Sequence, residues 1–115
     1  MTLRLTPDIL ASAYDFLRTT PPFKSWRLPE ADDVAFHVVR DPAIYADFGV
    51  DDDGGPLIRV SLAKNGHTVT LLQSMAHEMI HLRQFQTGDK ETHGPRFQKA
   101  AAKVCAVHGF DHKTF

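Results

Sequence analysis

The spacing of apolar residues changes along the chain, and each change predicts an element. Behind Thr6, which can cap a helix, and Pro7, which suits its first position, apolar side chains recur at helical spacing to about Arg18. The proline-rich stretch that follows is expected to be irregular, with Phe23 and Trp26 as core anchors. The stripe of the first helix is expected to consist of Ile9, Leu10, Ala13, Phe16 and Leu17.

From Val34 onward the pattern alternates between apolar and polar positions, which is typical of strands. Strands are predicted at residues 34–39, 44–50 and 57–63. The acidic run at residues 51–55 joins the last two strands as a hairpin turn. It lacks the spaced ligands and the closing glutamate of a calcium loop, so a solvated turn is the better interpretation.

A longer helix is predicted at residues 68–86, with two different faces. Its apolar stripe can pack into a core, while the other face presents polar groups to a cleft. Gly94 and Pro95 predict the start of another helix, which ends at His108 before Gly109. The apolar stripe consists of Leu72, Met75, Met79 and Leu82, and the polar face of Thr70, Ser74, His77, His81 and Gln84.

The polar face carries the chain's most informative motif, His77-Glu78-Met79-Ile80-His81. Two histidines four residues apart on a helix lie on the same side, so their imidazoles can converge on one metal ion. Glu78 points roughly 80° away from their bisector, close enough to touch a zinc-bound water but badly placed as a ligand. Zinc lowers the pKa of its bound water toward about 7, and Glu78 can then act as general base.

A catalytic zinc site needs a third protein ligand, and two residues compete for that position. His93 follows a polar turn and directly precedes the helix entry at Gly94 and Pro95, which anchors it. Glu91 lies two residues earlier, in the middle of the loop. The better anchored position favours His93 over Glu91.

These motifs resemble the SprT-like metalloprotease domain, the group that includes Spartan. The resemblance rests on the pentapeptide and on His93-Gly94-Pro95-Arg96-Phe97, and it covers about residues 60 to 108. It implies that His77, His81 and His93 bind Zn²⁺ and that Glu78 is the catalytic base. It also implies a compact gluzincin-like core, with Phe97 as a packing aromatic. The WLM metalloproteases share a related histidine layout, but the second motif fits the SprT pattern better.

The order of elements predicts an α+β fold: an N-terminal helix, a three-stranded sheet, the zinc-binding active-site helix and a C-terminal helix. With 115 residues and 43% hydrophobic content, the chain is expected to form one SprT-like domain over residues 1–115. The single cysteine, Cys105, cannot build the thiolate zinc ribbon that many family members carry. The sequence therefore predicts a minimal form of the domain.

The net charge of -1 bears on the partners. The sequence leaves a nucleic-acid partner open, but this charge gives it no support, and the basic residues near the second motif can equally be solvated surface. No apolar leader follows Met1-Thr2-Leu3-Arg4-Leu5, and no run is long enough to span a bilayer, which predicts a cytoplasmic protein without a membrane partner. Oligomeric state is left open.

The predicted function is that of a zinc metalloprotease of the HExxH…H type, an endopeptidase that acts on a protein or peptide substrate. Unfolded or DNA-associated proteins are candidate substrates. One of the two strands in residues 44–63 is expected to align the substrate by strand addition. The alternative is a zinc-binding regulatory or interaction module with latent or lost protease activity. For the oxyanion, His67, His112 and Tyr45 remain candidates, and the sequence does not select among them.

Overall fold

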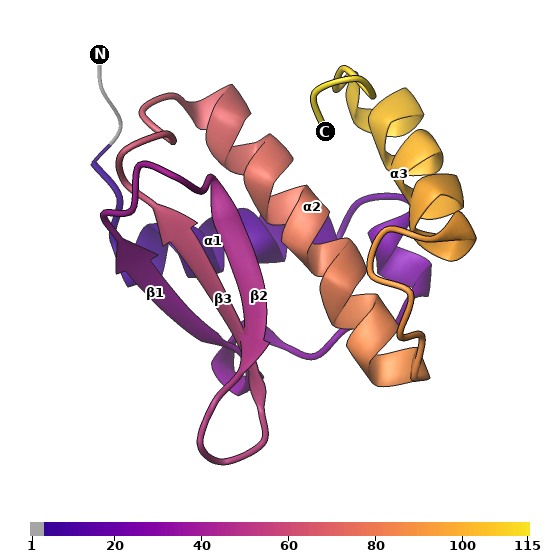
Figure 1. The fold of residues 1–115 in the computed structure, drawn as a ribbon, viewed down its shortest axis with the longest axis horizontal. Coiled ribbons are helices and arrows are strands. Elements are labelled where there is room, and N and C mark those ends of the chain that lie inside the picture. Colours follow the sequence, from indigo (N-terminus) through magenta and orange to yellow (C-terminus); the bar gives the residue numbers. More distant parts are fainter. Residues whose placement is uncertain (1–3) are drawn as a thin grey trace.

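The long helix α2 (Thr68–Thr87) lies at the centre of the molecule, where it contacts the helices α1 (Pro7–Arg18) and α3 (Pro95–His108) and two strands of the sheet. The computed structural model describes residues 4–115. In Figure 1, α2 runs between the sheet and α3, and α1 crosses behind the sheet and α2. The fold is α+β and forms a single small domain, which confirms the predicted class and order of elements.

The sheet contains β1 (Ala35–Val39), β2 (Ala46–Val50) and β3 (Pro56–Ser61) in the order β1-β3-β2. β2 and β3 form the predicted antiparallel hairpin, whereas β1 pairs with β3 in parallel. β3 therefore has a neighbour on each side. Within the described residues, β2 is an edge strand, and it is the edge that lies beside α2.

The first helix begins and ends where the sequence predicts. The Thr6 hydroxyl accepts a hydrogen bond from the backbone N–H of Ile9 at 3.2 Å, which satisfies one of the free amides of the first turn. The predicted stripe is wrong at Phe16, whose side chain is 54% exposed, and Tyr14 is fully buried instead. Tyr14 can be buried because its hydroxyl donates to the carbonyl of Pro29 at 2.5 Å.

The irregular segment after α1 packs against the core as expected. Phe23 is fully buried, and Trp26 is partly buried against it, with ring centroids 4.9 Å apart in an edge-to-face arrangement. Arg83 of α2 lies over the Trp26 ring, 4.7 Å from its centroid. This segment therefore braces the side of α2 that carries Arg83.

Asn65, in the turn between β3 and α2, connects three elements. Its side-chain amide donates to the carbonyls of Tyr45 and Ser61, at 2.8 Å and 2.7 Å, and its side-chain oxygen accepts from the Ser74 hydroxyl at 2.7 Å. Asn65 is fully buried, and a buried amide is tolerated only when such partners are present. These bonds fix the start of β2 relative to α2.

The prediction of no membrane-spanning segment can be compared with residues 4–115. No helix in that range is both long and apolar enough to cross a bilayer. The prediction of no leader partly rests on residues 1–3, which lie outside the described residues.

Candidate metal centre

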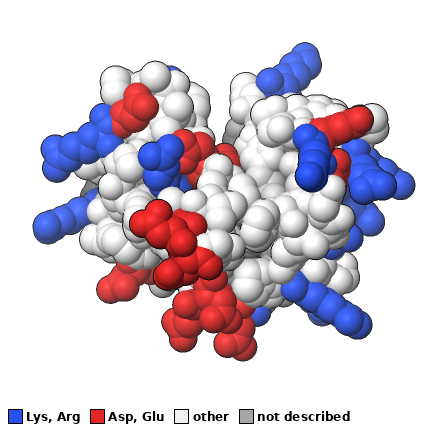
Figure 2. Space-filling view, turned by 60° about the horizontal axis from the view of Figure 1, so that its bottom comes forward, with Lys and Arg blue, Asp and Glu red and all other residues white. Residues whose placement is uncertain are grey.

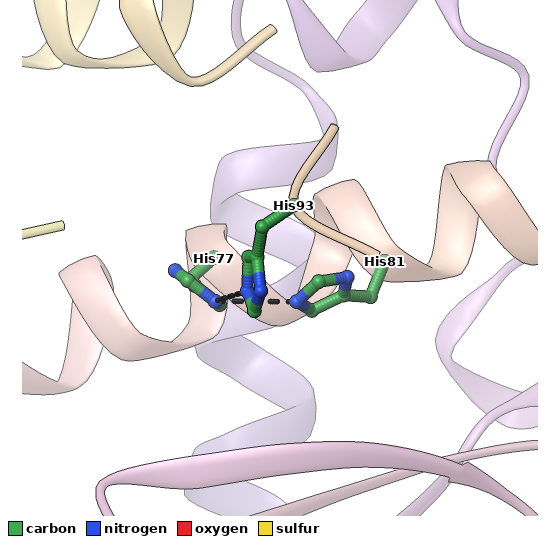
Figure 3. A group of neighbouring side chains, drawn as sticks. All are labelled: His77, His81 and His93. Carbon is green, nitrogen blue, oxygen red and sulfur yellow. Dashed lines mark hydrogen bonds between the residues drawn. The ribbon is translucent and has the colours of Figure 1, made fainter. Parts of the chain in front are cut away.

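Three imidazoles meet between α2 and the loop that precedes α3. His77 and His81 project from α2, and His93 reaches the same point from the loop, so that the three rings face one another (Figure 3). The Nε2 atom of His77 lies 3.2 Å from Nε2 of His81 and 3.5 Å from Nε2 of His93. The structure thus brings together all three residues that the sequence singles out as metal ligands.

These distances can be tested against the needs of a metal ion. Nitrogens bound tetrahedrally at about 2.0–2.1 Å lie roughly 3.3 Å from one another. The two His77 distances are 3.2 Å and 3.5 Å, on either side of this value, and all three ligand atoms lie within 4.8 Å of one another. The donor set and its spacing fit a divalent ion held by three imidazoles.

Glu91, the rival for the third position, is not part of this cluster. Its carbonyl accepts a hydrogen bond from the Gln84 side chain, at 3.0 Å, and another from the backbone N–H of Gly94, also at 3.0 Å. These bonds fold the loop around Glu91. His93, which lies two residues later and just before α3, is thereby brought to the other two imidazoles.

Gln84 fixes the orientation of His81. Its side-chain oxygen lies 2.7 Å from Nδ1 of His81, and because a carboxamide oxygen only accepts, Nδ1 carries the proton and Nε2 is left with a free lone pair. The Gln84 amide then donates to the Asp89 carboxylate at 3.1 Å and to the Glu91 carbonyl. One buried side chain thus sets the tautomer of one imidazole and holds the loop that carries another.

His77 is surrounded by groups that favour its neutral form. Burial, followed by the neighbouring imidazoles of His81 and His93, lowers the pKa of His77 to about 4. A hydrogen bond to the backbone of Phe115 acts in the opposite direction. Burial also lowers the pKa of His81, so these two imidazoles present lone pairs rather than charges at neutral pH.

Glu78 lies beside the imidazoles without joining them. Its side chain is 4% exposed, and burial, with a smaller contribution from Asp47 of β2, raises its pKa to about 8. A carboxyl group in this position can hold a proton at neutral pH and exchange it with a neighbour. This placement agrees with the geometry expected of the second residue of the motif.

A groove runs between β2 and α2 and crosses this centre. Two cavities of about 430 Å³ and 460 Å³ lie along it, and their linings have three residues in common: Ala46, His77 and Glu78. The shared residues place the imidazole cluster and the buried carboxyl group at the point where the two cavities join.

Phe97 and Gly94 explain the second motif in physical terms. The Phe97 ring stacks on His81, with centroids 4.8 Å apart, and meets His77 and His93 edge-on. At Gly94 a Cβ atom would come within 2.7 Å of the Glu91 Cβ and 2.6 Å of its carboxylate oxygen, so a side chain there would displace the loop. The glycine is needed for this close approach.

Several residues around the centre were not predicted to have a role. Gln84 was placed on the polar face, and its position three residues after His81 is the one signal that could have indicated the contact. Phe115 carried no signal, because its approach to His77 depends on how the chain folds back after α3. Of the oxyanion candidates, Tyr45 lines the groove, whereas His67 and His112 are not among the lining residues.

A small α+β domain with three convergent imidazoles on an HExxH helix and a following loop is a metalloprotease-type domain in its fold and its site. The model of the SprT-like family matches residues 58–114, a segment that begins in β3 and includes both motifs. Residues 58–114 therefore form a SprT-like segment, as the two motifs predict. No curated protein matches the chain.

Proposed function

We propose that the protein is a zinc-dependent endopeptidase, with His77, His81 and His93 as ligands and Glu78 as general base. The observation that carries this proposal is the meeting of three imidazole nitrogens beside a buried carboxyl group, at the join of two cavities in one groove. Three neutral imidazoles are the ligand set of several catalytic zinc sites and leave a coordination position free.

Zinc held by these residues would supply a Lewis acid that polarises the scissile carbonyl and makes water a stronger acid. The chain's own residues perform the proton transfers. Glu78 accepts the proton of the attacking water in its ionised form and then delivers that proton to the leaving amine. Gln84 keeps His81 in one tautomer, and Phe97 holds the imidazoles in place.

β2 is the strand proposed to align the substrate. β3 pairs on both sides, so of the two strands considered from the sequence only β2 has a free edge within residues 4–115, and Ala46, Asp47 and Phe48 of that strand line the groove. An extended peptide can add to such an edge through main-chain hydrogen bonds, which gives affinity without strong side-chain selection. A protein or peptide in extended conformation is therefore the proposed substrate.

The test is hydrolysis of an unfolded protein such as casein by the zinc-loaded chain, with and without a chelator. Glu78→Gln should lower the rate by about 10²–10⁴-fold, because the general base is removed, while metal analysis should show unchanged zinc. Glu30→Gln is the matched control, since Glu30 is exposed and lines neither cavity. Loss of zinc in Glu78→Gln would instead identify Glu78 as a ligand. A zinc-loaded chain that binds polypeptides but never cleaves them would support the regulatory or interaction module.

A further inference from the structure

The two halves of the groove differ in chemistry. The half next to the start of β2 and the first turns of α2 is lined by apolar and uncharged polar side chains together with His77 and Glu78. The other half, toward the loop before α3, contains three further charged residues: Asp47, Asp89 and Lys90. The first half, of about 430 Å³, is called the apolar half below; its apolar lining consists of Ile44, Tyr45, Ala46, Val69 and Phe115.

Large apolar side chains on the rim of this half are exposed. Val69 is 68% exposed and Tyr45 is 54% exposed, and they face the same cavity from α2 and from the segment before β2. Exposed apolar side chains that share one concave surface are typical of a ligand site, whereas isolated ones carry no such meaning.

Tyr45 is held in place rather than free to move. Its carbonyl accepts from the backbone N–H of Ser61 at 2.9 Å and from the buried Asn65 amide at 2.8 Å. The Lys64 ammonium lies over its ring, 4.7 Å from the centroid. Tyr45 is thus an ordered part of the wall, and order that exists before binding lowers the entropic cost of binding.

Phe115 contributes an aromatic ring to the wall of the apolar half. The Gln73 amide donates to the Thr114 carbonyl at 3.0 Å, and this bond brings the Phe115 ring to 5.3 Å from the His77 ring, between centroids. The segment forms one wall of the cavity and still leaves the volume given above.

We propose that the apolar half binds an aliphatic or aromatic side chain of the polypeptide substrate, next to the bond that is cleaved. The inference rests on the proposed endopeptidase function, because the cavity reaches the scissile position through the shared residues Ala46, His77 and Glu78. The inference narrows the proposed substrate class to extended polypeptide segments that have an apolar residue on one defined side of the scissile bond. The other half of the groove, toward the loop before α3, accepts the residues on the other side of that bond.

The test compares Val69→Asp with Val107→Asp. Val69 is in the first turn of α2, where an acidic residue is favourable, and its exposure means that little packing is lost. Val107 is 50% exposed on α3 and lines neither cavity, so it is the matched control. Thermal melting of both variants establishes that they are folded.

The readout is cleavage of two peptide series, in which one residue on either side of a central bond is varied among Leu, Phe, Ser and Asp. The native chain should favour Leu and Phe over Asp on one side only, by roughly 10–200-fold, the range that an apolar pocket supplies. Val69→Asp should lose at least tenfold of this preference, and Val107→Asp should keep it. A native chain without such a preference, or a Val69→Asp variant that retains it, would overturn the inference.

Binding of the same peptides to Glu78→Gln, measured by fluorescence anisotropy, separates this inference from the proposed function. In one outcome the native chain cleaves none of the peptides, yet Glu78→Gln binds the Leu and Phe peptides preferentially and loses this preference when Val69→Asp is added. The apolar half is then a binding site, and the endopeptidase proposal fails. In the opposite outcome cleavage occurs and depends on Glu78, but Val69→Asp changes neither cleavage nor binding. The endopeptidase proposal then holds, and the apolar half is not the subsite.

Discussion

The imidazoles of the metal centre are held in two different ways. His77 and His81 stand on α2, a helix whose opposite side packs Met75, Met79 and Leu82 into the core. His93 stands on a largely exposed loop, residues 88–94, that contains no apolar side chain. The loop takes its shape from polar contacts instead, chiefly those of Gln84.

This difference shows which ligands are positioned by extensive packing and which ligand is positioned by a few hydrogen bonds. Two ligands are fixed by packing that involves much of the core, so no single contact decides their position. The third ligand is fixed by a few hydrogen bonds, each of which contributes modestly on its own. Gln84 joins the two parts, because it contacts His81 on one side and the loop on the other.

The largest effect is expected from removing the loop-borne ligand itself. His93→Ala should lower zinc affinity by more than the roughly 10–100-fold typical of changes behind the ligands, because a donor atom is lost. Competition with a chromophoric chelator measures this directly. Normal zinc binding by His93→Ala would assign the third position to another donor, and the double variant with Glu91→Ala would show whether Glu91 takes it.

A smaller effect is expected from cutting the connection between the two parts. Gln84→Ala keeps all three imidazoles but removes the hydrogen bond that fixes the tautomer of His81 and the bonds that hold the loop. Zinc affinity should therefore fall by about 10–100-fold. Gln86→Ala, an exposed glutamine on the same helix, should change it little. Equal zinc affinity in the two variants would mean that the loop keeps its shape without Gln84.

The smallest effect concerns the charge at the loop's anchor. The hydrogen bond from Gln84, and next the one from the Glu91 backbone, hold the pKa of Asp89 below its usual range. The ionised form is favoured in the folded state, so this contribution to stability is present at neutral pH and is lost as the pH falls through the lowered pKa. An NMR titration of the metal-free protein should show that Gln84→Ala moves the Asp89 midpoint upward. An unchanged midpoint would show that Gln84 does not anchor this carboxylate.

The helix-borne part of the centre could be predicted from the sequence because helical periodicity is local. Spacing alone placed His77 and His81 on one face, and Gly94 and Pro95 indicated the helix entry that positions His93. The contacts of Gln84 with the loop span five and seven residues, across the end of α2, and depend on how the loop closes. Periodicity gives no information on such a closure.

The same reasoning explains the errors and gaps in the fold. Phe16 and Tyr14 lie near opposite borders of the apolar stripe, and the buried Tyr14 hydroxyl has a partner in the Pro29 carbonyl, which periodicity does not reveal. The hairpin followed from its turn residues, whereas the parallel pairing of β1 with β3 joins segments that are distant in sequence. That pairing makes β2 the edge strand beside α2.

Asn65 has a consequence for how this groove can change. One wall of the groove is β2 and the other is α2, and at one end the two are connected through the Asn65 carboxamide, which binds Tyr45, Ser61 and Ser74. Substitutions on the lining can therefore retune which side chains are accepted while the aperture stays constant. Changing the width of the groove would require replacing Asn65 and its partners together. A shorter or apolar residue at position 65 alone would leave the buried partners without a hydrogen bond.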